Sequence, residues 1–89
     1  MSEQICISII VPFYNAEKYI KNCFDTLLAQ DFKKSFEIIM VNDYSTDSSL
    51  NKIKQHNIPS LRLFSLPSNK GPSAARNEGI KNARGKYIF

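Results

Sequence analysis

The feature that most constrains this chain is an apolar run, Phe36–Val41, that ends abruptly at the polar segment Asn42–Ser48. Only Glu37 interrupts the run, and near-continuous apolar sequence of this length is typical of a parallel strand buried on both faces. Short polar side chains follow, among them the carboxylate of Asp43, just before a helix is expected to begin. In α/β proteins this junction is the usual place for a bound ligand, so Asp43 is the first residue to explain.

The same arrangement occurs at two other places in the chain. The apolar segment Ile7–Val11 runs into Pro12–Asn15, and Leu61–Leu66 runs into Pro67–Gly71. Because the carboxyl ends of parallel strands meet at one edge of a sheet, the three polar loops predict one shared site. The side chains expected to converge there are Tyr14, Asn15, Asp43, Lys70 and Arg76.

Helical spacing separates the apolar runs. Residues 16–30 carry one apolar stripe, with Asn15 as the expected N-cap, and residues 31–34 break the pattern. The segment Ser45–Asp47 offers capping side chains to a second helix, which is expected to run to about His56. A third helix is expected to follow the third strand.

That third helix opens at Pro72, which fits a first turn, and runs to about residue 83, with Gly85 as the expected stop. Residues 86–89 look like the start of a fourth strand. The order β-α-β-α-β-α-β predicts a three-layer α-β-α sandwich with a mostly parallel sheet. Because a domain rarely ends inside a strand, we expect residues 1–89 to be a fragment of a larger domain.

Composition and charge exclude several classes of protein. The formal net charge is +4, but the basic residues are scattered and only Lys33 and Lys34 are adjacent, so a nucleic-acid footprint is not expected. Cys6 and Cys23 lack metal-site spacing and are expected to be buried, reduced thiols. His56 is expected at the surface. No segment resembles a signal peptide or membrane span, so the chain is expected to be cytoplasmic, with membrane association of a longer protein left open.

The polar loops favour a ligand with two different ends. The carboxylate of Asp43 only accepts hydrogen bonds, so its natural partner is a base imide N–H or a ribose hydroxyl. Lys70 and Arg76 supply positive charge, and the backbone N–H groups near Gly71 are expected to be free for an anion. Tyr14 is placed to stack on a base or ribose. A nucleoside phosphate fits this set.

Each of these residues also has a purely structural alternative. Asp43 would serve as a cap for the helix that follows it, Arg76 would pair with Glu78 or solvent, and Tyr14 would belong to the packing. Asp47 and Glu17 would be caps or partners of a helix dipole. The glycine-rich signatures of P-loop NTPases and dinucleotide enzymes are absent from the sequence, which leaves a nucleotide held mainly by side chains and strand ends.

Three segments, residues 7–15, 39–47 and 69–79, closely resemble the N-terminal nucleotide-binding half of a family two glycosyltransferase of the GT-A fold. The resemblance covers nearly the whole chain. It implies an inverting transfer of a sugar from a nucleotide diphosphate donor, most often a UDP-sugar, to a hydroxyl of a saccharide or lipid-linked acceptor in polysaccharide biosynthesis.

The resemblance also implies roles for individual residues. Pro12 and Tyr14 would line the base and ribose pocket, Asp43 would accept from the uracil imide, and Glu17 would reach the ribose side. The border of the nucleotide would be formed by Lys70, Gly71 and Arg76.

The family holds a divalent cation, Mn or Mg, through a D-x-D motif just after the fourth strand, and its general base lies further on. We therefore expect no catalytic residue and no metal ligand in this chain, and no activity from it alone. Two other hypotheses are a non-catalytic nucleotide-binding or interaction module and a receiver-like domain, although the latter needs an acidic pair where this chain has Pro12–Asn15. An exposed sheet edge would also allow a homo-oligomer.

Overall fold

The computed structural model describes residues 4–29, 35–56, 58 and 60–89. In this part of the chain four strands alternate with three helices, and they are β1 (Ile7–Phe13), α1 (Ile20–Leu28), β2 (Phe36–Asn42), α2 (Ser49–Gln55), β3 (Leu61–Ser65), α3 (Pro72–Asn82) and β4 (Tyr87–Ile88). The expected order of elements is confirmed. The predicted break at residues 31–34 lies outside the described residues, as does the last residue of the first predicted helix.

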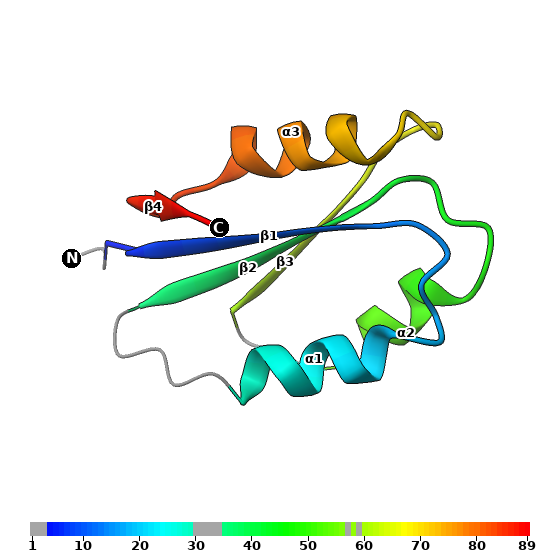
Figure 1. Ribbon diagram of the computed structural model, residues 1–89, viewed down its shortest axis with the longest axis horizontal. Coiled ribbons are helices and arrows are strands. Elements are labelled where there is room, and N and C mark those ends of the chain that lie inside the picture. The colour runs from blue at the N-terminus through cyan, green and yellow to red at the C-terminus, as the bar shows by residue number, and fades with distance from the viewer. Residues whose placement is uncertain (1–3, 30–34, 57, 59) are drawn as a thin grey trace.

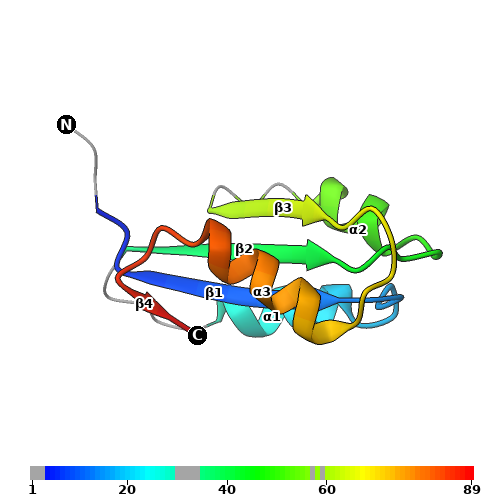
Figure 2. The same cartoon turned by 90° about the horizontal axis from the view of Figure 1, so that it is seen from above.

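The strands form one parallel sheet in the order β3-β2-β1-β4. Ile10 of β1 is in register with Ile39 of β2, which is in register with Arg62 of β3. Helices α1 and α2 cover one face of the sheet and α3 covers the other (Figure 1). Seen from above, α3 lies over β1, with β3 and β4 at opposite edges (Figure 2). The predicted three-layer α/β architecture is therefore confirmed.

Alternation along the strands divides the core between the two faces. On the α1 and α2 face the buried cluster is Phe13, Ile20, Phe24, Ile38, Met40 and Ile53. On the α3 face it is Ile10, Ile39, Val41, Leu66 and Ala75. Gly79 lets α3 approach closely, because a Cβ there would lie 2.6 Å from Cγ2 of Ile10. The near-continuous apolar run of β2 thus reflects burial on both sides.

One predicted helix cap is wrong, and another is confirmed only in part. Helix α1 begins at Ile20, not at residue 16, and its N-cap is Tyr19, because Asn15 has a left-handed backbone (φ 47°) and turns its side chain toward the next loop. Helix α2 begins at Ser49, and of the predicted capping segment Ser45–Asp47 only Asp47 accepts a hydrogen bond from its first turn.

The predicted stop at Gly85 is also displaced. Helix α3 ends at Asn82 with Ala83 as its C-cap, and Gly85 lies beyond it, packed against β1. A Cβ on Gly85 would lie 2.6 Å from the backbone nitrogen of Ser8. Glycine is needed there for close approach of two backbones and not for ending the helix.

A buried carboxylate ties the amino end of the sheet to the end of α3. Glu37, 2% exposed, accepts hydrogen bonds from Oγ of Ser8 (2.6 Å), the N–H of Arg84 (2.7 Å) and Nη1 of Arg62 (2.9 Å). Burial by itself raises the pKa of Glu37, but these hydrogen bonds and the Arg62 charge outweigh it and hold the pKa below its ordinary value. Sequence reasoning treated Glu37 only as an interruption of the strand.

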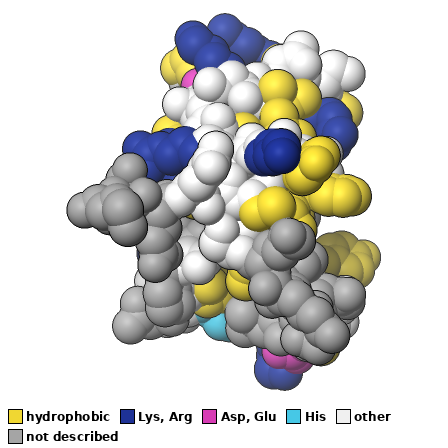
Figure 3. Space-filling view, turned by 90° about the vertical axis from the view of Figure 1, so that its left-hand side faces the viewer, with side chains coloured by type: hydrophobic (Ala, Val, Ile, Leu, Met, Phe, Trp, Pro, Cys, Tyr) yellow, Lys and Arg dark blue, Asp and Glu magenta, His cyan; other side chains and the backbone are white. Residues whose placement is uncertain are grey.

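The two cysteines and the histidine that the sequence analysis singled out are half-buried or at the surface. Both cysteines are free and half-buried, and burial raises the pKa of Cys23. His56 is exposed, as predicted, and its ring packs 4.8 Å from that of Phe24. At the amino end of the strands, Figure 3 shows hydrophobic side chains beside Lys and Arg at the surface. None of the described helices is long and apolar enough to cross a membrane.

Candidate functional site

A cavity of about 180 Å³ opens at the carboxyl edge of the sheet, on the face that carries α3. It lies where β1 and β2 end and α3 begins, as the strand-end argument predicts. The residues that line it are Pro12, Phe13, Tyr14, Asp43, Pro72 and Ala75. Three of the predicted site residues, Pro12, Tyr14 and Asp43, therefore line the same cavity. Tyr14 remains 48% exposed, so its ring is accessible to a ligand.

Asp43 is buried at 3% exposure, and both of its carboxylate oxygens have partners. Oδ1 accepts the backbone N–H of Lys70 at 2.8 Å, and Oδ2 accepts the backbone N–H of Gly71 at 2.9 Å. The alternative that Asp43 caps the helix following it is wrong, because the carboxylate binds the segment before α3. Each oxygen still has a lone pair available, so one more donor from a ligand can be accepted.

This contact corrects one expectation about anion binding. The N–H groups of Lys70 and Gly71 were expected to be free for an anion, but Asp43 already occupies both. Gly71 adopts φ 94°, which favours glycine, and Pro72 has no N–H to offer. In the first turn of α3, the N–H groups of Ser73 and Ala74 are the ones that lack an intrahelical acceptor.

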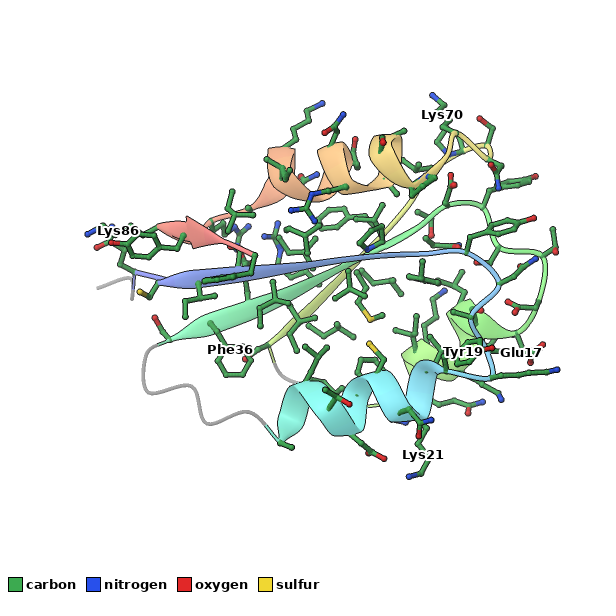
Figure 4. All side chains as sticks on the ribbon, in the orientation of Figure 1. Glu17, Tyr19, Lys21, Phe36, Lys70 and Lys86 are labelled. Carbon is green, nitrogen blue, oxygen red and sulfur yellow. The ribbon has the colours of Figure 1, made fainter. Side chains whose placement is uncertain are left out.

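The two predicted cations lie near the same end of α3. Lys70 is in the loop that enters α3, and its side chain points outward (Figure 4). Arg76 is exposed and follows Pro72 by one helical turn, next to the cavity-lining Ala75. Neither Lys70 nor Arg76 lines the cavity itself.

Glu17 is not brought to the cavity. It precedes α1, on the opposite side of the sheet edge from Lys70 (Figure 4). Its backbone N–H donates to Oδ2 of Asp47 at 3.3 Å, and its carbonyl accepts from Nζ of Lys52 at 3.3 Å. The predicted contact of Glu17 with a ribose stays a prediction.

The β1 and β2 loops are joined by hydrogen bonds that the sequence did not reveal. Oδ1 of Asn15 accepts the N–H groups of Thr46 (2.8 Å) and Asp47 (3.2 Å). The N–H of Asn15 donates to Oγ of Ser45 at 3.0 Å. Asp47 in turn accepts the N–H and hydroxyl of Ser49. These contacts fix the two loops that carry Tyr14 and Asp43 relative to each other.

The ionisation state of Asp47 follows from the same contacts. Desolvation raises the pKa of Asp47, but the hydrogen bonds from Ser49 and from the backbone N–H of Glu17 more than offset it, so its pKa lies below the ordinary value. Asp47 is therefore a structural carboxylate, as the sequence alternative proposed. Among the described residues, no group of three or more His, Cys, Asp or Glu side chains is placed to hold a metal ion.

Comparisons of the sequence with a family model and with known proteins agree on one family. The model of the family described as Glycosyl transferase family 2 matches residues 8–89. Poly(ribitol-phosphate) beta-N-acetylglucosaminyltransferase TarS of Staphylococcus aureus strain Mu50 is 40% identical over 85 residues, which are 92% of this chain and 15% of that protein. Glycosyltransferase GlyA of Streptococcus pneumoniae is 41% identical over 83 residues, 92% of this chain and 12% of the relative. The chain thus spans less than one sixth of these relatives.

Solved structures agree in fold. S. aureus TarS 1–349 in complex with UDP-GlcNAc superposes with a TM-score of 0.88 at 39% identity, over 96% of this chain and 25% of that one. The same protein in complex with UDP also gives 0.88. The mannosyltransferase PcManGT of Pyrobaculum calidifontis, in complex with GDP-Man and Mn²⁺, gives 0.86 at 24% identity and supports the fold alone. The predicted GT-A fold is confirmed.

Proposed function

The chain belongs to glycosyl transferase family 2, and from that premise we propose that residues 1–89 form the N-terminal nucleotide-binding part of a glycosyltransferase domain. The donor is a nucleotide diphosphate sugar of the UDP series. The acceptor is a hydroxyl group of a saccharide or a lipid-linked saccharide, and the transfer inverts the anomeric centre. The complexes of TarS with UDP and UDP-GlcNAc support this choice of donor.

The position of Asp43 carries the proposal. Its carboxylate is buried in the wall of the cavity and oriented by the N–H groups of Lys70 and Gly71, so it presents a fixed acceptor to a ligand. An imide N–H of uracil matches such an acceptor, whereas a phosphate would be repelled by it. The base therefore lies at Asp43, between the carboxylate and the ring of Tyr14, with Pro12 completing that wall.

The phosphates lie toward the start of α3 in this arrangement. Arg76 and Lys70 flank that end, and the first-turn N–H groups add a favourable dipole. Glu17 lies outside the cavity, with its backbone N–H bound to Asp47, and is proposed to reach the ribose from there.

The chemical step of such a transfer uses a divalent cation and a general base. A divalent cation on the diphosphate would stabilise the leaving group, but no metal-ligand cluster is present in the described part of the chain, so we derive no step through it. Neither do we assign a general base here. The contribution of this chain is to bind and orient the nucleotide, and pairing with a second copy through the β4 edge stays a prediction.

Titration of the chain with UDP, monitored by NMR chemical shifts, tests the proposal. We expect saturable binding of UDP, weaker binding of CDP because N3 of cytosine carries no proton to donate to the carboxylate, and weaker binding of uridine because it lacks phosphates. Arg76→Gln should weaken UDP binding about two- to fivefold, as expected for an exposed charge contact, and leave uridine unchanged.

The matched control is Lys81→Gln, which removes an exposed charge from the last turn of the same helix. It should leave both affinities unchanged. If the wild-type chain shows no saturable shift with UDP, the proposed function is wrong. If it binds UDP but the two charge variants behave alike, the assignment of the phosphate end is wrong.

A further inference from the structure

Tyr44 adopts a backbone conformation that a bulky side chain rarely takes. Among the described residues, only Asn15 (φ 47°) and Tyr44 (φ 61°) combine a side chain with positive φ. Asn tolerates this region because its short polar side chain bonds locally, and Asn15 does so with Thr46 and Asp47. A tyrosine has no such compensation, so the conformation of Tyr44 is strained.

The ring of Tyr44 does not recover this strain by packing. It is 54% exposed, and no hydrogen bond or ring contact joins it to another residue in the described part of the chain. A glycine would adopt the same backbone without strain. Residues held in sparsely populated backbone regions cluster at binding sites, where the surrounding structure fixes them. Hydrogen bonds of the neighbouring residues hold the loop that carries Tyr44 in this way.

The loop of Tyr44 is fixed on both sides and adjoins the cavity. The preceding residue is Asp43, a cavity wall residue, and the N–H of the following Ser45 donates to Oδ1 of Asn42 at 2.9 Å. Oγ of Ser45 accepts the N–H of Asn15 at 3.0 Å. Tyr44 and Tyr14 therefore immediately precede two hydrogen-bonded residues on adjacent loops, and Tyr14 lines the cavity. Two exposed aromatic rings are presented at the same sheet edge.

We propose that Tyr44 is a further base-recognition residue, whose ring stacks on the nucleobase that Asp43 holds. This inference rests on the proposed nucleotide-binding function. An aromatic ring covers a planar base without reading its hydrogen-bond pattern, so Tyr44 supplies affinity for the base while Asp43 supplies the choice among bases. The backbone strain at Tyr44 is retained because the ring is needed at this position.

The test uses the 89-residue chain with UDP and with ribose 5-phosphate, a base-free probe, in NMR titrations that measure millimolar affinities. Tyr44→Ala should weaken UDP binding about fivefold or more, the effect of losing one base-stacking ring, and leave ribose 5-phosphate unchanged. Tyr44→Phe should bind UDP as wild type does, because it keeps the ring.

Thermal unfolding of the same variants separates strain from the ring. Tyr44→Gly should melt about 4 °C or more above Tyr44→Ala, because only glycine relieves the left-handed strain, while both bind UDP equally weakly. The matched pair Tyr19→Gly and Tyr19→Ala, at an exposed tyrosine with φ −113°, should show the opposite order of melting and unchanged UDP binding.

Three results would overturn the inference. One is wild-type affinity for UDP in Tyr44→Ala, with Arg76→Gln still weakened, which leaves the proposed function standing. Another is equal weakening of UDP and ribose 5-phosphate, which indicates a general structural effect of Tyr44. The third is an absence of UDP binding by the wild-type chain, which removes the proposed function together with this inference.

Discussion

Replacement of Asp43 by asparagine is expected to destabilise the fold as well as change the ligand site. In the wild type both carboxylate oxygens accept backbone N–H groups, at 2.8 and 2.9 Å, and the residue is 3% exposed. An asparagine side chain keeps one acceptor oxygen but directs an amide donor at the other N–H. One charge-assisted hydrogen bond is lost, and a backbone donor loses its partner.

The magnitude follows from those two losses. A hydrogen bond to a charged group contributes about 1.5–3 kcal/mol, and the loop at Lys70 is exposed, so water compensates part of the loss. We therefore expect Asp43→Asn to lower the free energy of unfolding by about 2 kcal/mol. A chain of 89 residues has roughly 4–13 kcal/mol in total, so the variant stays folded. Its Tm should fall by about 8–16 °C.

Urea and thermal unfolding followed by circular dichroism measure this change. Asp25→Asn is the matched control, because Asp25 is an exposed carboxylate whose partner is Lys21 on the same helix, and it should change stability by less than about 0.5 kcal/mol. Equal stability of wild type and Asp43→Asn would refute the role of the two N–H contacts. UDP binding by Asp43→Asn must be measured at a temperature below the unfolding transition of that variant.

Two further predictions concern the amino end of the sheet and the packing of glycines. Because the pKa of Glu37 is depressed below its ordinary 4.5, its stabilising effect is present above that pH and is lost as the pH falls through the folded-state pKa. Urea titrations between about pH 3 and 7 should thus show a steeper acid loss for wild type than for Glu37→Gln, and parallel curves would contradict the assignment. Gly85→Ala should cost about 1–3 kcal/mol in unfolding free energy, because its Cβ meets the backbone of Ser8 at 2.6 Å. Gly79→Ala should cost less, because the nearest atoms to its Cβ are side-chain atoms of Ile10 and Val41 and because alanine regains about 1 kcal/mol of helix propensity, and the reverse order of the two variants would contradict the packing argument.

The order of elements and the location of the site were predictable because both depend on local pattern. The strands are apolar runs of the length expected for buried parallel strands, and the crossover rule places their carboxyl ends at one edge. Pro12, Tyr14 and Asp43 do line one cavity there. Helix starts were predicted less well, because Asn15 and the capping segment Ser45–Asp47 form hydrogen bonds with each other across the two loops.

Long-range hydrogen bonds were outside the reach of the sequence. Every residue except proline has a similar backbone N–H, so nothing in the sequence indicates that Asp43 binds those of Lys70 and Gly71. The same holds for Glu37, a buried carboxylate whose partners come from β1, β3 and the turn after α3. Positive φ at Tyr44 is likewise invisible, because the residue type argues against it.

The sequence by itself determined the alternation of strands and helices, the parallel sheet and the edge at which the cavity opens, since hydrophobic period and chain handedness are properties of local segments. Tertiary structure alone decided which polar groups at that edge remain available for further hydrogen bonds. Each carboxylate oxygen of Asp43 accepts one backbone N–H from the segment that enters α3. Tyr44, the next residue in the chain, has an exposed ring. Hydrogen-bond partners are chosen by proximity in the folded chain, and proximity is set only when the layers pack.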